Sequence, residues 1–159
     1  MTRKHIHPML SAGVLSLVAL SGSNAFAQSQ VYALDLPVTA QTTTNTCTAG
    51  EPVILNGTVH LQYSFTTDPA GVNHFSITTA NDLSGVGQIS GAAYKASDSN
   101  VYTVNSSDPT AQLNPDLKSD LTPVAVGTSL SLVQTLQISM DTSGNLAAQI
   151  NQNATQCAN

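Results

Sequence analysis

Two histidines, His60 and His74, are the residues beyond position 27 best suited to proton transfer, because imidazole titrates near neutral pH. Both take the outward phase of an alternating apolar pattern. If Phe65 lies opposite Phe75 in a hairpin, the imidazole rings of His60 and His74 are six residue rows apart, roughly 20 Å. They therefore cannot bind one metal ion through that hairpin, and each is interpreted as a surface histidine.

Nucleophilic catalysis by serine is the second chemistry to weigh. The chain is rich in serine but contains no Gly-x-Ser-x-Gly turn. The nearest segment, residues 127–131, opens an alternating strand, which predicts serines that face solvent. A hydrolase that combines dispersed serine, His60 and aspartate is therefore the third of three functional hypotheses.

The carboxylates Asp108, Asp116 and Asp120 gather in the segment 108–123. On a helical turn Asp116 and Asp120 would share a face, as calcium ligands or a general-acid pair do. Their spacing does not fit an EF-hand loop, and the prolines nearby with Lys118 indicate a solvated loop that crosses between sheets. Calcium stays the alternative at these aspartates, and no cofactor is expected.

Tyr94 and Tyr102 are the aromatic side chains that could stack on a sugar or another small ligand. Tyr63, by contrast, belongs to an inward apolar stripe. Packing in the core is the alternative role for Tyr94 and Tyr102. Both are therefore candidate ligand-binding residues, with a glycan among the ligands to consider.

The charge balance excludes several classes of function. Residues 28–159 contain no Arg and keep only Lys95 and Lys118 against nine acids, so the net charge is 2 − 9 = −7. Nucleic-acid binding needs a Lys/Arg surface to neutralise phosphates, and phosphate enzymes need similar clamps. We expect neither a nucleic-acid partner nor a nucleotide substrate.

The first 27 residues predict a cleaved secretory signal. Arg3 and Lys4 precede an apolar run over residues 9–20, and Ala25-Phe26-Ala27 fits a signal-peptidase site. The run is shorter than the roughly 20 residues of a membrane span, so no transmembrane segment is expected. The predicted location is secreted, periplasmic or at the cell surface.

In such an oxidising compartment, Cys47 and Cys157 predict one structural disulfide.

Alternation with a period of two residues dominates the rest of the chain and predicts strands. Residues 53–67 place their odd positions inward, with Gly57 as a bulge or bend, and residues 130–140 place their even positions inward. Turns at 68–72 and 141–145 predict two hairpins, with 65 opposite 75 and 140 opposite 146. Residues 84–96 and 101–104 predict shorter strands in the middle of the chain.

Residues 129–140 carry neither charge nor proline, the usual protection of an edge strand. This strand is either central in its sheet or pairs with another copy during assembly. The N-terminal arm, residues 28–46, alternates likewise and is either a donated strand or the first strand of its own domain.

Two resemblances bear on these alternatives. The sequences GEPVILNGTVH, HFSI and LSGVGQISGAAY within residues 50–102 resemble small exported bacterial proteins of unassigned function, which implies an exported β domain and no particular activity. The alternation of the arm ahead of Cys47 resembles the N-terminal extension of chaperone–usher pilus subunits. The position of Cys157 at the extreme C-terminus departs from that family.

The sequence thus predicts an all-β domain over residues 28–159, a single antiparallel β-sandwich with a β-barrel as the alternative. The leading functional hypothesis is a non-enzymatic surface, matrix or adhesion component that self-associates or meets a surface partner through strand edges. A small-ligand or glycan-binding module is the alternative from another class.

Overall fold

The structure is a computed structural model and describes residues 29–158, so the predicted signal, residues 1–27, lies outside the described residues. Eight strands account for most of this part of the chain: β1 (Gln30–Asn45), β2 (Glu51–Thr67), β3 (Asn73–Gly87), β4 (Ala93–Ala96), β5 (Ser99–Ser106), β6 (Asp116–Pro123), β7 (Leu130–Met140) and β8 (Leu146–Cys157). Within these residues, no helix has the length and apolar character that crossing a membrane requires.

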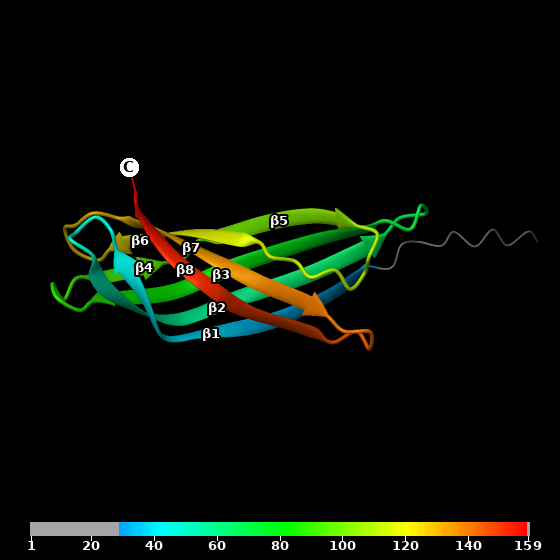
Figure 1. Cartoon of the computed structure of the whole chain (residues 1–159), viewed down its shortest axis with the longest axis horizontal. Coiled ribbons are helices and arrows are strands. Elements are labelled where there is room, and N and C mark those ends of the chain that lie inside the picture. The colour runs from blue at the N-terminus through cyan, green and yellow to red at the C-terminus, as the bar shows by residue number, and fades with distance from the viewer. Residues whose placement is uncertain (1–28, 159) are drawn as a thin grey trace, which may run out of the picture.

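The strands form one antiparallel sheet that nearly closes on itself. The order is β1-β2-β3-β4-β6-β7-β8, and β5 pairs with the first half of β3. Strands β7 and β8 cross over the layer formed by β1, β2 and β3 (Figure 1). Side-chain hydrogen bonds and a disulfide, in place of a backbone ladder, join β8 to β1. The predicted all-β fold is confirmed, with a barrel-like closure of the sheet.

Both predicted hairpins are confirmed in their registers. Phe65 lies opposite Phe75, and Met140 lies opposite Leu146. The glycine in each turn takes a positive φ, +82° in the first and +83° in the second, which a residue with a Cβ adopts only at a cost. The agreement of turn and strand patterns places the apolar residues of both hairpins inside the sheet.

A bulge lies beside Gly57, but in β1 and not in β2, where the sequence had placed a bulge or bend. Two residues of β1, Thr39 and Ala40, lie opposite the single residue Asn56 of β2, and the Asn56 side chain accepts a hydrogen bond from the Ala40 N–H at 2.9 Å. The extra residue shifts the inward positions of β1 from even, as at Val38, to odd numbers. The second half of β1 therefore turns different side chains toward the core than a regular alternation would.

The core runs the length of the sheet. Its largest side chain is Tyr63, which is 2% exposed and stacks near Tyr32 and Phe75 with tilted rings. Burial, and then the charge that Tyr32 would carry, raise the pKa of Tyr63 to about 12. Gln134 interrupts the apolar stripe of β7 but is fully buried, and its amide donates to Asn153 on β8.

Two segments fold differently from the sequence prediction. Residues 84–96 are not one strand: β3 ends at Gly87, and a turn with Gly91 at φ +68° leads into β4. Residues 116–123, predicted as part of a crossing loop, form β6. The prolines that suggested a loop precede this strand or end it, at Pro115 and Pro123, where no ladder hydrogen bond is lost.

The structure also decides between the alternatives for the two edge candidates. β7 lies between β6 and β8, so it is central and needs no protection from strand addition. β1 pairs with β2 of its own chain along nearly its whole length. The N-terminal arm is thus the ordinary first strand of this domain.

Candidate functional site

His60 lies on the outer face of β2, where its Nδ1 is 2.7 Å from Asp35 Oδ1 on β1. The two residues are direct partners in the β1–β2 register, and both side chains are more than half exposed. Among the described residues, no hydroxyl is within hydrogen-bond distance of the ring. The pair therefore lacks the nucleophile that a catalytic triad requires.

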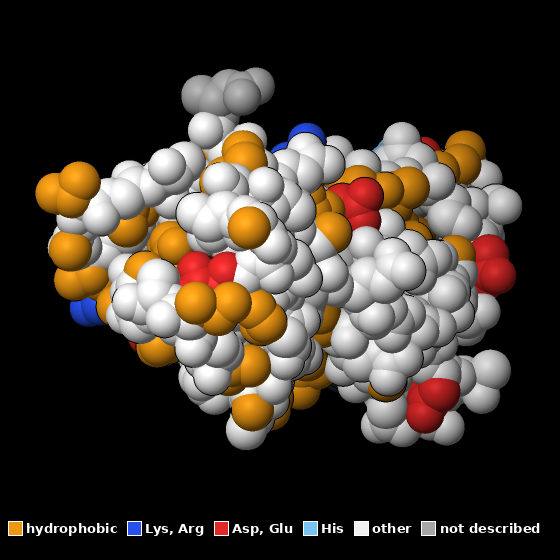
Figure 2. Space-filling model, turned by 60° about the vertical axis from the view of Figure 1, so that its left-hand side comes forward, with side chains coloured by type: hydrophobic (Ala, Val, Ile, Leu, Met, Phe, Trp, Pro, Cys, Tyr) orange, Lys and Arg blue, Asp and Glu red, His pale blue; other side chains and the backbone are white. Residues whose placement is uncertain are grey.

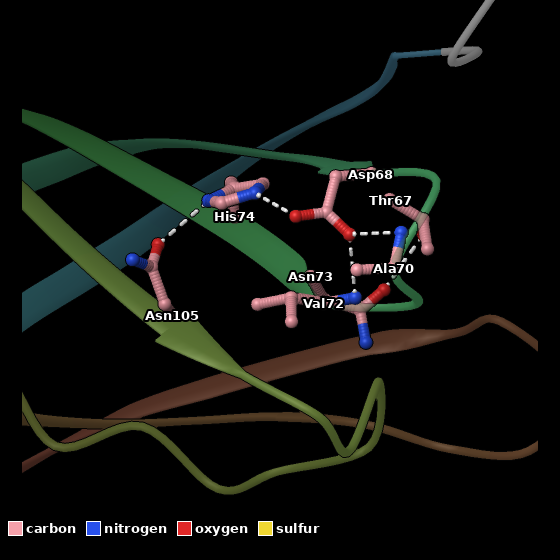
Figure 3. Close-up of polar contacts among 7 residues, drawn as sticks. All are labelled: Thr67, Asp68, Ala70, Val72, Asn73, His74 and Asn105. Atoms are coloured by element: carbon pink, nitrogen blue, oxygen red, sulfur yellow. Dashed lines mark hydrogen bonds and ion pairs between the residues drawn. The ribbon is translucent and has the colours of Figure 1, made fainter.

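His74 is held by oxygen atoms on both sides (Figure 3). Its Nε2 lies 3.1 Å from Asp68 Oδ2, and its Nδ1 lies 2.9 Å from Asn105 Oδ1. Hydrogen bonds to Asp68 and then to Asn105 raise the pKa of His74 above its usual 6.5. The Val72 N–H, followed by His74, holds the pKa of Asp68 below its usual 3.8. Because each ring nitrogen already contacts an oxygen atom of the protein, His74 has no free nitrogen to act as a general base.

The three candidate calcium ligands do not meet. Asp108 accepts hydrogen bonds from the N–H and hydroxyl of Thr110 in its own loop, and Asp116 accepts one from the Thr135 hydroxyl. Asp116 and Asp120 share the exposed face of β6, where four residues of strand separate them by roughly 13 Å. Within residues 29–158, no three His, Cys, Asp or Glu side chains come close enough to hold a metal ion.

The predicted disulfide between Cys47 and Cys157 is present and ties the end of β8 to the turn after β1.

The two candidate tyrosines lie in different places. Tyr94 on β4 is 5% exposed, whereas Tyr102 lies on the free edge of β5 and is 38% exposed. Tyr94 lines a cavity.

That cavity, called here the end pocket, has a volume of about 410 Å³ and opens at the disulfide-tied end of the sheet. Three loops surround it: the β1–β2 turn, the β3–β4 turn and the β6–β7 loop. Buried side chains of Asn45, Glu51 and Tyr94 form its floor. The Asn45 amide donates to the Tyr94 hydroxyl at 3.2 Å, and its oxygen accepts from the N–H groups of Cys47 and Thr48. The floor is thus fixed by hydrogen bonds to the loop that carries Cys47.

Glu51 is the only glutamate of the chain and the only carboxylate in this floor. Its Oε1 accepts three hydrogen bonds from the β3–β4 turn: Ile89 N–H at 2.9 Å, Ser90 N–H at 2.6 Å and the Ser90 hydroxyl at 2.8 Å. These bonds, the Ser90 N–H first, hold the pKa of Glu51 below its usual 4.5. At neutral pH the pocket floor therefore carries a negative charge.

The rim of the end pocket is largely apolar. Ala49 and Ile89 lie on it, and Ile89 is 82% exposed. Val124 and Val126, in the loop that supplies the third side of the pocket, are also exposed. Figure 2 turns this end of the molecule toward the viewer and shows hydrophobic side chains on its surface. An apolar rim above a few fixed polar groups is the usual make-up of a small-ligand site.

Sequence reasoning named Tyr94 but missed Glu51, Asn45 and Ser90. A signal for Glu51 was available, because position 51 continues the odd, inward phase of residues 53–67 back to the start of β2. Asn45 carried no such signal, since the bulge in β1 shifts its phase.

Comparison of the chain with protein-family models, curated proteins and solved structures found no match.

Proposed function

We propose that the protein is an exported, non-enzymatic binding protein that takes up a small ligand in the end pocket. The observation that carries this proposal is the pocket itself, in which a buried floor of fixed polar groups lies beneath an apolar rim. Its volume falls within the range of small-molecule sites. Export is supported by the signal pattern in the sequence and by the disulfide.

The non-enzymatic part of the proposal follows from the state of the acid–base groups. Both nitrogens of His74 are engaged, and His60 meets only Asp35. Glu51 accepts hydrogen bonds from two N–H groups and a hydroxyl, which favour the carboxylate form over a proton donor. In the described residues neither histidine has a hydroxyl within hydrogen-bond distance. The one hydroxyl at Glu51, that of Ser90, donates to a carboxylate oxygen that already accepts two N–H groups.

A titration with the neutral fluorescent dye N-phenyl-1-naphthylamine tests the binding function. We expect saturable binding to the native protein and its loss in Thr128→Trp, because Thr128 lines the pocket and the indole would fill it. Thr142→Trp, in the exposed β7–β8 turn, is the matched control and should bind as the native protein does. Absence of saturable binding, or equal binding by both variants, would contradict the proposal.

A surface or matrix component remains the second candidate because β5 has an open edge. This strand carries no charged residue and no proline, and Val101 on it is 71% exposed. Unprotected edges of this kind add strands from other chains. Analytical ultracentrifugation tests the idea: concentration-dependent association that Val101→Lys abolishes supports it, and a monomer at all concentrations excludes it.

A further inference from the structure

We infer that the end pocket selects an amphipathic cation, an apolar group that carries a protonated amine, over neutral and anionic molecules of the same shape. The inference rests on the proposed binding function and names the class of ligand.

The end pocket is negatively charged. Glu51 is a carboxylate in the floor, and no Lys, Arg or His lines the cavity within the described residues. Residues 29–158 hold only two cationic side chains apart from histidine, Lys95 and Lys118. Both are exposed, on β4 and β6, and neither pairs with Glu51. The negative charge is balanced only by N–H and O–H dipoles, so an anion would meet repulsion and a cation attraction.

One carboxylate oxygen of Glu51 is free to accept a further hydrogen bond. Oε1 accepts three hydrogen bonds, whereas Oε2 has one contact, to the Ser90 hydroxyl at 3.1 Å. That hydroxyl has a single proton, which Oε1 already shares at 2.8 Å. Oε2 therefore keeps lone pairs for a ligand donor, and a charged N–H donor makes the strongest such bond.

The fold holds the Glu51 carboxylate in place. A Cβ atom at Gly87 would lie 2.5 Å from Glu51 Oε1 and 2.8 Å from its carboxyl carbon, so only glycine leaves room for this position. The β3–β4 turn then directs two consecutive N–H groups at the same oxygen. The free oxygen is thus presented in one orientation, which favours a directed contact with an ammonium group.

The walls of the end pocket suit an apolar body on the ligand. Ala49, Ile89 and Ala92 give the cavity apolar walls, and Val126 extends apolar surface beyond the rim. Burial of hydrocarbon against these walls contributes about 25 cal/mol per Å² of apolar area removed from water. An alkyl or aromatic body with an amine at its inner end fits both the walls and the floor.

The test compares three probes of equal chain length, octylammonium, 1-octanol and octanoate, by isothermal titration calorimetry at neutral pH. We expect octylammonium to bind the native protein about tenfold more tightly than 1-octanol, and octanoate to bind least. In Glu51→Gln, which retains an oxygen acceptor for the turn, the three affinities should converge. Asp120→Asn removes an equal charge from an exposed site outside the pocket and should retain the native order.

Each outcome separates the two proposals. Equal affinity of the native protein for all three probes, with binding lost in Thr128→Trp, overturns the cation preference and leaves the binding function standing. Failure of all three probes and of the neutral dye to bind overturns both proposals. A native order that Glu51→Gln leaves unchanged shows that Glu51 is not the selecting group, and overturns the inference.

Discussion

At the scale of single residues, glycine positions show where the backbone itself limits the sequence. Gly57 has φ +140°, and a Cβ there would collide with the Asp82 carbonyl on β3. Gly71 also has a positive φ, +82°, but open space surrounds it. The first glycine is therefore required by both conformation and close approach, and the second by conformation alone.

These two glycines give a matched pair of variants. Gly57→Ala should lower the free energy of unfolding by about 2 kcal/mol or more, because strain and collision add. Gly71→Ala should cost about 1 kcal/mol, from the positive φ alone. Urea denaturation measures both; equal losses would show that the β2–β3 contact at Gly57 is looser than described.

The ion pair of His74 and Asp68 predicts a dependence of stability on pH. The raised pKa of His74 means that its stabilisation is complete below about pH 6.5 and is lost as the pH rises through the higher folded value. The lowered pKa of Asp68 means that its contribution is present above about pH 3.8 and is lost as the pH falls through the lower folded value. The pair therefore stabilises most in mildly acidic solution.

Denaturation of the native protein and of His74→Gln at about pH 5.5 and about pH 8.5 measures this effect. The stability difference between the two proteins should be larger at the lower pH. Introducing Asp68→Asn into both should reduce the pH dependence of that difference. A difference that is larger at about pH 8.5 would mean that His74 is neutral in the fold.

At the scale of elements, the seam between β1 and β8 depends on side chains and on the disulfide. Cys47 and Cys157 are 110 residues apart in the chain, and a cross-link over a loop of this length stabilises by about 4–5 kcal/mol in the chain-entropy model. The same cross-link fixes the turn that follows Asn45 and brings Ala49 to the end pocket. Fold stability and pocket geometry are thus linked at one place.

Replacing both cysteines by serine should lower the free energy of unfolding by roughly 4 kcal/mol and weaken dye binding to the folded fraction. Urea denaturation and the dye titration report the two effects separately. A variant with native stability, or one that is destabilised but binds the dye with native affinity, would show that the disulfide does not organise the pocket.

Side-chain hydrogen bonds protect the outer edge of β6. The Asn100 side chain donates to the Lys118 carbonyl at 3.0 Å and accepts from its N–H at 3.4 Å, while Asp98 accepts from the Asp120 N–H at 2.9 Å. The side chains of Asn100 and Asp98 take the place of a neighbouring strand beyond the end of β4. Without them, the backbone groups of Lys118 and Asp120 on β6 would be open to strand addition.

Asn100→Ala should therefore lower the free energy of unfolding by about 1 kcal/mol and accelerate hydrogen exchange at the Lys118 amide. Thr103→Ala, on the outer face of β5, is the control and should leave that amide unchanged. Unaltered exchange in Asn100→Ala would contradict the role of this side chain as a substitute strand.

The elements also show why sequence reasoning reached the fold but only part of the site. Alternation and turn residues are local signals, and they predicted both long hairpins with their registers. β6 was missed because its flanking prolines dominate a local reading, although Leu117, Ser119 and Leu121 alternate inward. The hydrogen bonds that fix Glu51 come from the turn at residues 88–92. Because this segment was predicted as strand, the N–H groups that donate to Glu51 could not be predicted.

At the scale of the whole molecule, one end differs from the other. The far end has two tight hairpins, each closed by an aspartate that accepts backbone N–H groups, Asp68 and Asp141. The disulfide-tied end has exposed apolar side chains and the end pocket between three loops. We therefore expect binding at the disulfide-tied end.

Nuclear magnetic resonance of ¹⁵N-labelled native protein, titrated with octylammonium, tests that claim most directly. We expect saturable amide shifts concentrated in residues 45–51, 88–94 and 124–128, with the hairpin turns at 68–72 and 141–145 unaffected. Shifts centred on those hairpin turns or along β5, or no saturable shift at all, would contradict it.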